Sequence, residues 1–361
     1  MTIAQRAGLE AIAPYKQGIA PRTIHGLEPF KLSSNENPYP PLPSVTKVVA
    51  AAAANIHRYP SISADALTNA LAERWGVAPG NVALGAGSVE VASQLIHAIT
   101  NPGDQVMFAW RSFEAYPVLI TVAGATPQPV PLTPEGGHDL PAMAAAVTPR
   151  TRMIFLCNPN NPTGSVLTAS AVEEFIDAVP TEVLIVIDEA YLHFNDDPES
   201  AIGMDVFRRH PNVVVLHTFS KAYGLAGLRL GYAIGAPELI VNLRKVAVPF
   251  AVTALAQEAG IASLQAEKEL QERINVLVAE RQRVYVGLLD AGLPVLPSQA
   301  NFLWLGSGIH TDALASLFED NALSVRAFPG EGIRISVGTP DSNDRVLATA
   351  RQAAGLLTPR L

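Results

Sequence analysis

Five short runs of consecutive apolar residues, rich in β-branched side chains, constrain the fold of this chain most strongly. They cover residues 82–84, 105–108, 152–156, 183–187 and 213–216. Strands that helices cover on both faces are apolar at consecutive positions, whereas half-exposed strands alternate. Helix-spaced segments such as residues 64–75 and 169–178 lie between the runs. The sequence therefore predicts an α/β fold with a mostly parallel central sheet flanked by helices.

The rest of the chain divides around this predicted sheet. Residues 1–43 are rich in proline and glycine, so we expect an extended N-terminal arm, and residues 254–291 have a helical pattern that stops at Gly292. We expect strands at 301–305, 323–327 and 333–337, and helices at 311–321 and from Pro340 onward. We predict a large domain over 44–250 and a smaller α/β domain over 251–361, which includes the connecting helix and packs with the arm 1–43.

Composition argues against several classes of protein. The 361 residues include 33 acidic and 25 basic side chains, and the net charge of −8 argues against a nucleic-acid partner. No apolar stretch approaches the roughly 20 residues of a membrane helix, and residues 1–9 lack the apolar core of a signal peptide. A single cysteine, Cys157, precludes an internal disulfide, and no HExxH or paired Cys/His spacing predicts a metal site. We expect a cytoplasmic enzyme with no metal and no membrane partner.

The segment 218–231 directly follows a fully apolar run and contains a lysine, Lys221. A lysine at the end of a buried strand is poorly solvated, which favours the neutral amine that attacks carbonyl groups. Ser220 and Arg229 flank it with a hydroxyl and a permanent cation, both suited to a phosphate. The alternative is a surface lysine in a glycine-rich turn.

An aspartate follows the apolar run 183–187 in the same way. Asp188 would lie at the carboxyl end of a strand, where open α/β sheets bind ligands, and a buried carboxylate there needs a positive partner. A protonated pyridine nitrogen is one such partner. The alternative is a helix N-cap. Tyr191, three residues later, could offer its hydroxyl to a phenolic oxygen.

Two further loops follow predicted strands. The segment 157–164 contains two Asn-Pro steps that would hold the Asn161 amide outward as a donor, although it could be a mere loop. In the segment 85–88, a strand passes into a helix whose first N–H groups and Ser88 hydroxyl would form an anion cradle. The combined inventory matches pyridoxal 5′-phosphate: an amine, an acid for a ring nitrogen, donors for a phenolate oxygen and phosphate contacts.

With these motifs in this order, the chain resembles the class I/II, fold-type I aminotransferases, and within them the histidinol-phosphate and aromatic amino acid group. The resemblance extends from residues 33–39 to residues 333–337. It implies that Lys221 forms the imine with pyridoxal phosphate, that Asp188 pairs with the ring nitrogen, and that Tyr191 and Asn161 donate to the ring oxygen. The implied phosphate site consists of Ala86, Gly87, Ser88, Ser220 and Arg229.

The resemblance also implies roles outside these motifs. Phe113 would stack on the cofactor ring, and Tyr59 would reach the cofactor phosphate of a neighbouring subunit, which implies a homodimer with shared active sites. Arg334 would grip the substrate α-carboxylate, and its alternation with apolar Ile333 and Ile335 fits that role. The alternative for Arg334 is a solvated strand arginine. Further candidates for substrate contact are Tyr15, Asn35, Asn301 and Arg326.

The implied activity is ping-pong transamination between an amino acid and a 2-oxo acid, for which we expect 2-oxoglutarate. Residues 110–116 and 248–250 favour an aromatic donor of the phenylalanine or tyrosine type, whereas residues 13–16 fit both groups. Histidinol phosphate is the alternative donor, and it would need basic residues for a second phosphate. A decarboxylase or lyase with the same cofactor, and a regulator without catalytic activity that binds it, are the remaining alternatives.

Overall fold

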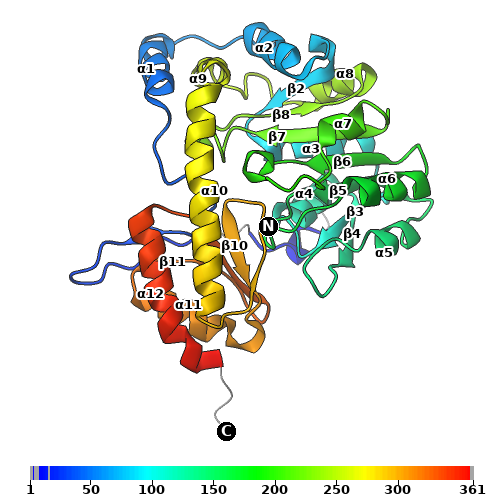
Figure 1. Cartoon of the computed structure of the whole chain (residues 1–361). Coiled ribbons are helices and arrows are strands. Elements are labelled where there is room, and N and C mark those ends of the chain that lie inside the picture. The colour runs from blue at the N-terminus through cyan, green and yellow to red at the C-terminus, as the bar shows by residue number, and fades with distance from the viewer. Residues whose placement is uncertain (1–2, 4–7, 15–16, 358–361) are drawn as a thin grey trace.

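The computed structural model describes residue 3, residues 8–14 and residues 17–357. A seven-stranded sheet lies at its centre, and in this sheet β8 alone runs against the other strands (Figure 1). The strands, in spatial order, are β2 (Val82–Gly85), β8 (Gly231–Ile234), β7 (Val213–Thr218), β6 (Leu184–Asp188), β5 (Thr151–Cys157), β3 (Gln105–Trp110) and β4 (Thr126–Pro131). The prediction of a mostly parallel sheet is confirmed.

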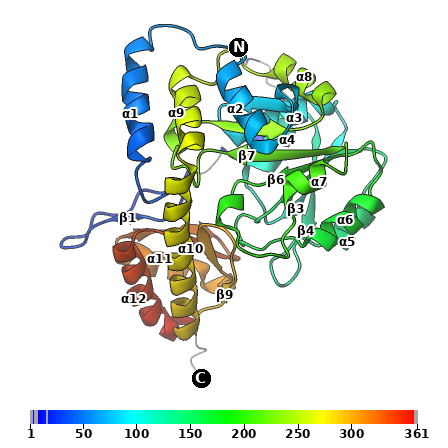
Figure 2. The same cartoon turned by 45° about the horizontal axis from the view of Figure 1, so that its top comes forward.

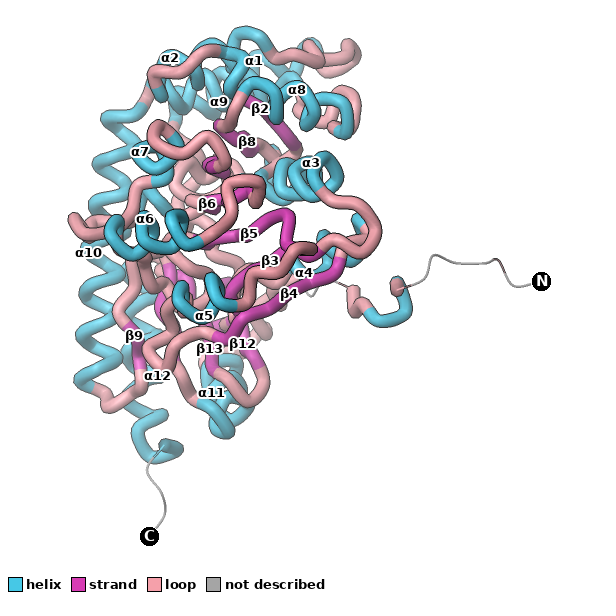
Figure 3. The backbone as a smooth tube through the Cα atoms, turned by 90° about the vertical axis from the view of Figure 1, so that its right-hand side faces the viewer, coloured by secondary structure: helices cyan, strands magenta, loops and turns pink. Residues whose placement is uncertain are grey.

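Helices cover both faces of this sheet, as the consecutive apolar runs predict (Figure 3). Every residue of β6 and β7 is buried. In β3, Val106 and Phe108 pack with one set of helices, whereas Met107 and Ala109 pack with the other. The first set is α3 (Ser88–Ile99), α4 (Ala115–Ala123) and α8 (Pro237–Val246), and the second is α5 (Leu140–Ala145), α6 (Ala169–Ala178) and α7 (Gly203–Phe207).

The expected helical stretch 254–291 is interrupted at Ala266. It forms α9 (Ala254–Gln265) and the long α10 (Glu267–Asp290). The two helices have different neighbours: α9 packs on α1 (Pro43–Ala52) and α2 (Asp65–Trp75), whereas α10 runs down to α12 (Pro340–Leu357) (Figures 1 and 2). Periodicity alone does not locate this break, because neither glycine nor proline marks it.

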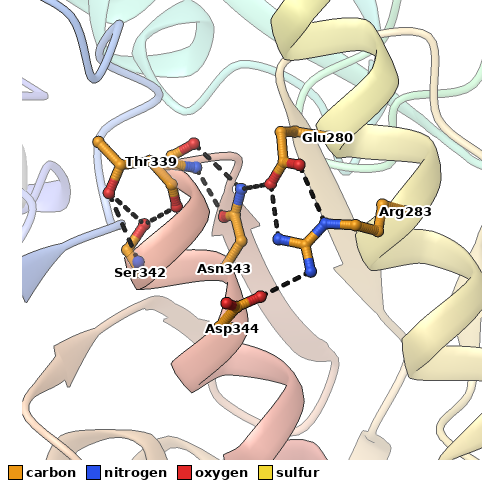
Figure 4. A network of polar contacts seen from close by, with 7 residues as sticks. Glu280, Arg283, Thr339, Ser342, Asn343 and Asp344 are labelled. Carbon is orange, nitrogen blue, oxygen red and sulfur yellow. Dashed lines mark hydrogen bonds and ion pairs between the residues drawn. The ribbon is translucent and has the colours of Figure 1, made fainter.

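The C-terminal part contains a second, antiparallel sheet beside α10. Its strands, in spatial order, are β12 (Arg326–Phe328), β13 (Gly332–Ser336), β10 (Phe302–Leu305) and β9 (Val295–Leu296). α11 (Thr311–Asp320) and α12 pack against each other. A polar network joins α10 to α12: Arg283 bridges Glu280 and Asp344, and Asn343 donates to Glu280 at 2.8 Å (Figure 4).

The N-terminal arm connects to this second part. Its strand β1 (Phe30–Lys31) pairs in parallel with β11 (Leu323–Ser324). Residues 33–36 then lie near the carboxyl ends of β6 and β7, where Asn35 contacts Tyr191 and Ser34 contacts Lys221. Short 3-10 turns complete the chain: Leu9–Ala11, Ala53–Asn55, Pro79–Asn81, Leu192–Phe194, Ala226–Leu228 and Gly308–His310. Across the described residues, no helix combines the length and apolar character needed to cross a membrane.

Candidate active site

One cavity of about 480 Å³ lies where the two sheets and the N-terminal arm meet. The carboxyl ends of β5 and β6 and the loop after β7 form its floor, and β12, β13 and residues 33–36 line its other side. Most of the predicted site residues line it: Asn35, Ser88, Phe113, Asn161, Asp188, Tyr191, Ser220, Lys221, Arg229, Arg326 and Arg334.

Lys221 lies three residues beyond the end of β7 and lines the cavity. Its Nζ donates a hydrogen bond to the Ser34 carbonyl oxygen at 3.3 Å. Burial is the main cause that lowers the pKa of the amine to about 8; the nearby Arg334 and Arg229 act in the same direction, whereas Glu36 and Asp188 oppose them. Lys221 is therefore not a surface lysine, and its neutral form is accessible near neutral pH.

Asp188 is the last residue of β6 and is buried. The Tyr116 hydroxyl donates to its Oδ2 at 2.6 Å, and the Ala190 backbone N–H donates to its Oδ1 at 3.3 Å. Burial raises the pKa of the carboxyl to about 6, although the two hydrogen bonds and Lys221 act in the opposite direction. The carboxylate caps no helix. It can accept a hydrogen bond from a positively charged ring nitrogen.

Tyr191 and Asn161 also line the cavity. Asn35 Nδ2 donates to the Tyr191 hydroxyl oxygen at 2.9 Å, so the phenolic hydrogen remains the tyrosine's own donor. The Asn161 amide oxygen accepts from Arg334, which leaves the amide NH₂ as the donor group of Asn161. Burial raises the pKa of Tyr191, so its hydroxyl keeps its hydrogen at neutral pH.

The predicted phosphate cradle surrounds the N-terminus of α3. Gly87 precedes this helix with a φ of 84°, and a Cβ at Gly87 would lie 2.3 Å from Arg229 Nη2. The Arg229 guanidinium donates to Ser220 Oγ at 3.3 Å and to the Ala86 carbonyl at 3.4 Å. The Ala86 N–H donates to Glu90 instead of facing the cavity. A helix N-terminus beside a guanidinium and two serine hydroxyls fits a phosphate group.

Arg334 is buried, with 7% of its surface exposed, so it is not a solvated strand arginine. It donates to the Ser33 carbonyl at 2.9 Å and to Asn161. Its neighbours Ile333 and Ile335 pack into the core of the second sheet, as their alternation predicts. The guanidinium thus faces the cavity, where a carboxylate can reach it.

Asn35 and Asn301 hold the arm beside Arg334. Asn301 Nδ2 donates to the Asn35 carbonyl at 3.1 Å, and the Ser336 hydroxyl donates to Asn35 Oδ1 at 3.1 Å. Asn301 does not line the cavity, so its contact with Asn35 positions the arm. Arg326 lines the cavity and forms an ion pair with Glu114.

Four described residues that the sequence predicted for the site are not among those that line the cavity: Ala86, Gly87, Asn301 and Tyr59. Tyr59 is 83% exposed and lies against Phe250, with ring centroids 4.7 Å apart. Tyr15 lies outside the described residues. Phe113 does line the cavity, and its ring meets the edge of Tyr116 at 5.4 Å.

Sequence reasoning missed several residues of the site. Tyr116 and Glu114 lie in a segment with the pattern of an ordinary helix start, and the Ser33 and Ser34 contributions are backbone carbonyls. Every residue has a backbone carbonyl, so the residue type does not indicate which carbonyl accepts a hydrogen bond in the site. The proximity of Tyr116 to Phe113 in the sequence was an available signal, since Tyr116 lies in the first turn of α4, three residues after Phe113, and their rings are in contact.

Comparisons with known proteins agree with this geometry. Residues 28–350 match the family described as aminotransferase class I and II. The chain is 54% identical to an aromatic amino acid aminotransferase of Cutibacterium acnes, covering 94% of this chain and 95% of that protein. It is 52% identical to a protein of the same name from Streptomyces avermitilis, covering 94% of each.

Among solved structures, the fold is similar to a histidinol-phosphate aminotransferase from Sinorhizobium meliloti, crystallised with pyridoxal 5′-phosphate. The TM-score is 0.85 at 28% identity, and the match covers 91% of each chain. The family match spans most of the chain and includes both sheets that form the cavity. The protein therefore belongs to the class I and II aminotransferase family.

Proposed function

We propose that this protein transfers the amino group of aromatic amino acids to a 2-oxo acid, with pyridoxal phosphate bound in the cavity between the two sheets. The observation that carries the proposal is the placement of Lys221, whose amine has a pKa lowered to about 8, in one cavity with Asp188. Arg334 enters the same cavity from the second sheet. These three groups supply an amine, an acceptor for a ring N–H and a site for a carboxylate.

One group of cavity residues would bind the cofactor, and another would act on the substrate. Arg229, Ser220 and Ser88 would hold the cofactor phosphate, and Tyr191 and Asn161 would donate to its ring oxygen. When bound, pyridoxal phosphate supplies a protonated ring that withdraws electrons and makes the Cα proton of an amino acid acidic. Asp188 would keep that ring protonated, because its carboxylate can accept a hydrogen bond from the ring N–H.

Lys221 and Arg334 act on the amino acid itself. Arg334 binds the α-carboxylate and so orients the Cα–H bond relative to Lys221. The Lys221 amine would then act as the general base that removes the Cα proton and would deliver that proton to the cofactor. The grip of Arg334 on the carboxylate disfavours its loss, and therefore favours transamination over decarboxylation.

The names of the similar proteins favour an aromatic donor. The curated relatives at 54% and 52% identity are aromatic amino acid aminotransferases. Histidinol phosphate is the second candidate donor because a structural neighbour at 28% identity is named for it. The relatives at 54% and 52% identity carry more weight than the structural neighbour at 28%.

The decisive experiment offers each donor to the purified enzyme. Phenylalanine, tyrosine and histidinol phosphate are supplied separately with 2-oxoglutarate and pyridoxal phosphate, and kcat/KM is compared. We expect phenylalanine and tyrosine to exceed histidinol phosphate by at least about tenfold, because a dianionic phosphate needs paired cations and an aromatic ring does not. A preference for histidinol phosphate would replace the donor and keep the aminotransferase activity.

We also propose that the enzyme is a homodimer with active sites shared between subunits. Support comes from exposed apolar side chains beside Tyr59. Ile62 and Val248, 69% and 62% exposed, line one surface hollow with Phe250, whose ring contacts Tyr59. Several large apolar side chains clustered on an exposed face mark an interaction site. Tyr59 lies outside the cavity of its own subunit, which leaves it available to a neighbouring subunit's site.

A further inference from the structure

Two arginines stand side by side in the cavity. Arg326 and Arg334 are direct partners across the antiparallel pair β12 and β13, so their side chains project from the same face of the sheet. Both line the cavity. Two adjacent guanidinium groups would suit a substrate with two anionic groups, such as a dicarboxylate or a phosphorylated acid.

The structure provides an anionic partner for Arg326. Glu114 Oε2 accepts hydrogen bonds from Arg326 Nη2 at 2.7 Å and from Arg326 Nε at 3.2 Å. The side chains of Arg326 and Glu114 are 11% and 27% exposed, so water screens their attraction only in part. Arg334 donates to the side-chain oxygen of Asn161 and to the carbonyl oxygen of Ser33.

A second cation at the edge of the cavity is paired in the same way. Lys31 Nζ lies 3.0 Å from a Glu36 carboxylate oxygen, and both residues line the cavity. Arg326 and Lys31 therefore each form an ion pair with a carboxylate of the protein itself. A neutral aromatic side chain meets no uncompensated charge from these pairs, whereas an anionic side chain must compete with Glu114 for Arg326.

We infer that Glu114 is a specificity-determining residue, whose carboxylate occupies Arg326 and lowers the affinity of the site for substrates with an anionic side chain relative to neutral aromatic ones. This inference rests on the proposed function and gives it a physical basis within the cavity. An acidic acceptor such as 2-oxoglutarate still binds through Arg334, but it does so against the competition of Glu114.

The same region contains a second ion pair, which serves as a control for a purely structural effect of the Glu114–Arg326 pair. Arg111 and Glu331 form a second ion pair, with Arg111 Nε 2.9 Å from Glu331 Oε2. It joins the same segment before α4 to the turn between β12 and β13. Neither residue is among those that line the cavity. Loss of the Arg111–Glu331 pair weakens the contact between the segment before α4 and the second sheet. It does not change the charges that line the cavity.

The test compares the holoenzymes of the wild type, Glu114→Gln and Glu331→Gln. Inhibition constants are measured for glutarate and 3-phenylpropanoate, two unreactive acids that differ in the charge of the distal group. Glutamine keeps the shape and a neutral acceptor for Arg326. We expect Glu114→Gln to shift the ratio of the two constants toward glutarate by about tenfold or more. The distal carboxylate of glutarate then no longer competes with the Glu114 carboxylate for Arg326, which is worth about one hydrogen bond to a charged group. Glu331→Gln should change it by less than about threefold.

Several results would overturn the inference, and a different result would refute the proposed donor. An unchanged ratio in Glu114→Gln, or an equal shift in both variants, would overturn it. Adding Arg326→Gln to Glu114→Gln should abolish the gain for glutarate, and a gain that persists would also overturn it. Wild-type enzyme that fails to use phenylalanine would refute the proposed donor, yet the inhibition ratio would still report on Glu114, so the two failures are distinguishable.

Discussion

Burial in the cavity moves two ionisable side chains toward the same pH range from opposite directions. The pKa of Lys221 falls to about 8 and that of Asp188 rises to about 6. Between these values the Asp188 carboxylate is ionised, and a usable fraction of Lys221 is a neutral amine. Desolvation is the main cause of both shifts, so one physical property of the cavity prepares both groups for work near neutral pH.

The pKa of Lys221 predicts how its reaction with pyridoxal phosphate depends on pH. Only the neutral amine is nucleophilic, so the rate constant of attachment should rise between about pH 7 and 9 and level off above the pKa of about 8. Stopped-flow absorbance after mixing apoenzyme with cofactor measures this rate, and Lys221→Ala should give no covalent signal. A rate that keeps rising toward the ordinary lysine pKa of 10.5 would contradict the prediction.

Tyr116 predicts a second pH effect. Its hydroxyl donates to Asp188 and stabilises the ionised carboxylate, so Tyr116→Phe should raise the pKa of Asp188 further above its usual range. The carboxylate would then be protonated at a higher pH, and the acid limb of kcat/KM should move up by about one pH unit. Tyr232→Phe removes a buried hydroxyl outside the cavity and serves as the control. An equal shift in both variants would refute a specific role for Tyr116.

At the scale of secondary-structure elements, β8 fixes the start of α3. A Cβ at Gly231 would lie 2.2 Å from the Ser88 backbone nitrogen and 2.6 Å from the Gly87 carbonyl carbon. Backbone atoms cannot turn aside as a flexible side chain can, so Gly231→Ala must displace the first turn of α3. That turn would contribute N–H groups to the predicted phosphate cradle. Its position therefore depends on Gly231, which follows Ser88 by 143 positions in the sequence but is adjacent to it in space.

Gly231→Ala should weaken both the fold and the cofactor site. We expect a loss of about 1–3 kcal/mol of unfolding free energy, as for overpacked cores, together with weaker binding of pyridoxal phosphate. Urea unfolding and cofactor titration measure the two effects. Gly227→Ala lies in the same segment, has nothing within 4 Å of its added Cβ, and should change neither. Normal cofactor affinity in Gly231→Ala would show that cofactor binding does not depend on how β8 packs against the start of α3.

Elements with an uninterrupted apolar pattern could be predicted from the sequence, and others could not. β5, β6 and β7 coincide with apolar runs because helices bury both of their faces. β4 escaped prediction because it contains Pro127, Pro129 and Pro131. Proline is tolerated there because β4 is an edge strand that pairs with β3 alone. The helix break at Ala266 depends on which neighbours the two halves contact.

At the scale of the whole molecule, the site assembles residues that are distant in the chain. Lys221 and Asp188 could be proposed from local pattern, since each follows an apolar run that ends at the cavity. Arg334 needed the family resemblance, because an arginine in an alternating strand is most often solvated. The contacts of Glu114 with Arg326, 212 positions away, depend on how the two sheets meet, which no local pattern encodes.

The proposed dimer makes a prediction that depends on two subunits at once. If Tyr59 contacts the cofactor phosphate of its neighbour, Tyr59→Ala should lower the affinity for pyridoxal phosphate by about tenfold, the value of one hydrogen bond to a charged group. Lys221→Ala should be inactive. In a mixed dimer of the two variants, one site combines an intact Lys221 with the intact Tyr59 of the other subunit.

Mixing the variants should therefore restore wild-type cofactor affinity in the active sites of the mixed dimers. The measurement is activity against cofactor concentration, before and after the subunits are exchanged, with sedimentation velocity to confirm the dimer. If Tyr59 served the site of its own subunit, each active site in the mixture would still carry the damaged residue. Affinity would then stay at the level of Tyr59→Ala, and a monomeric wild type would remove the basis for sharing altogether.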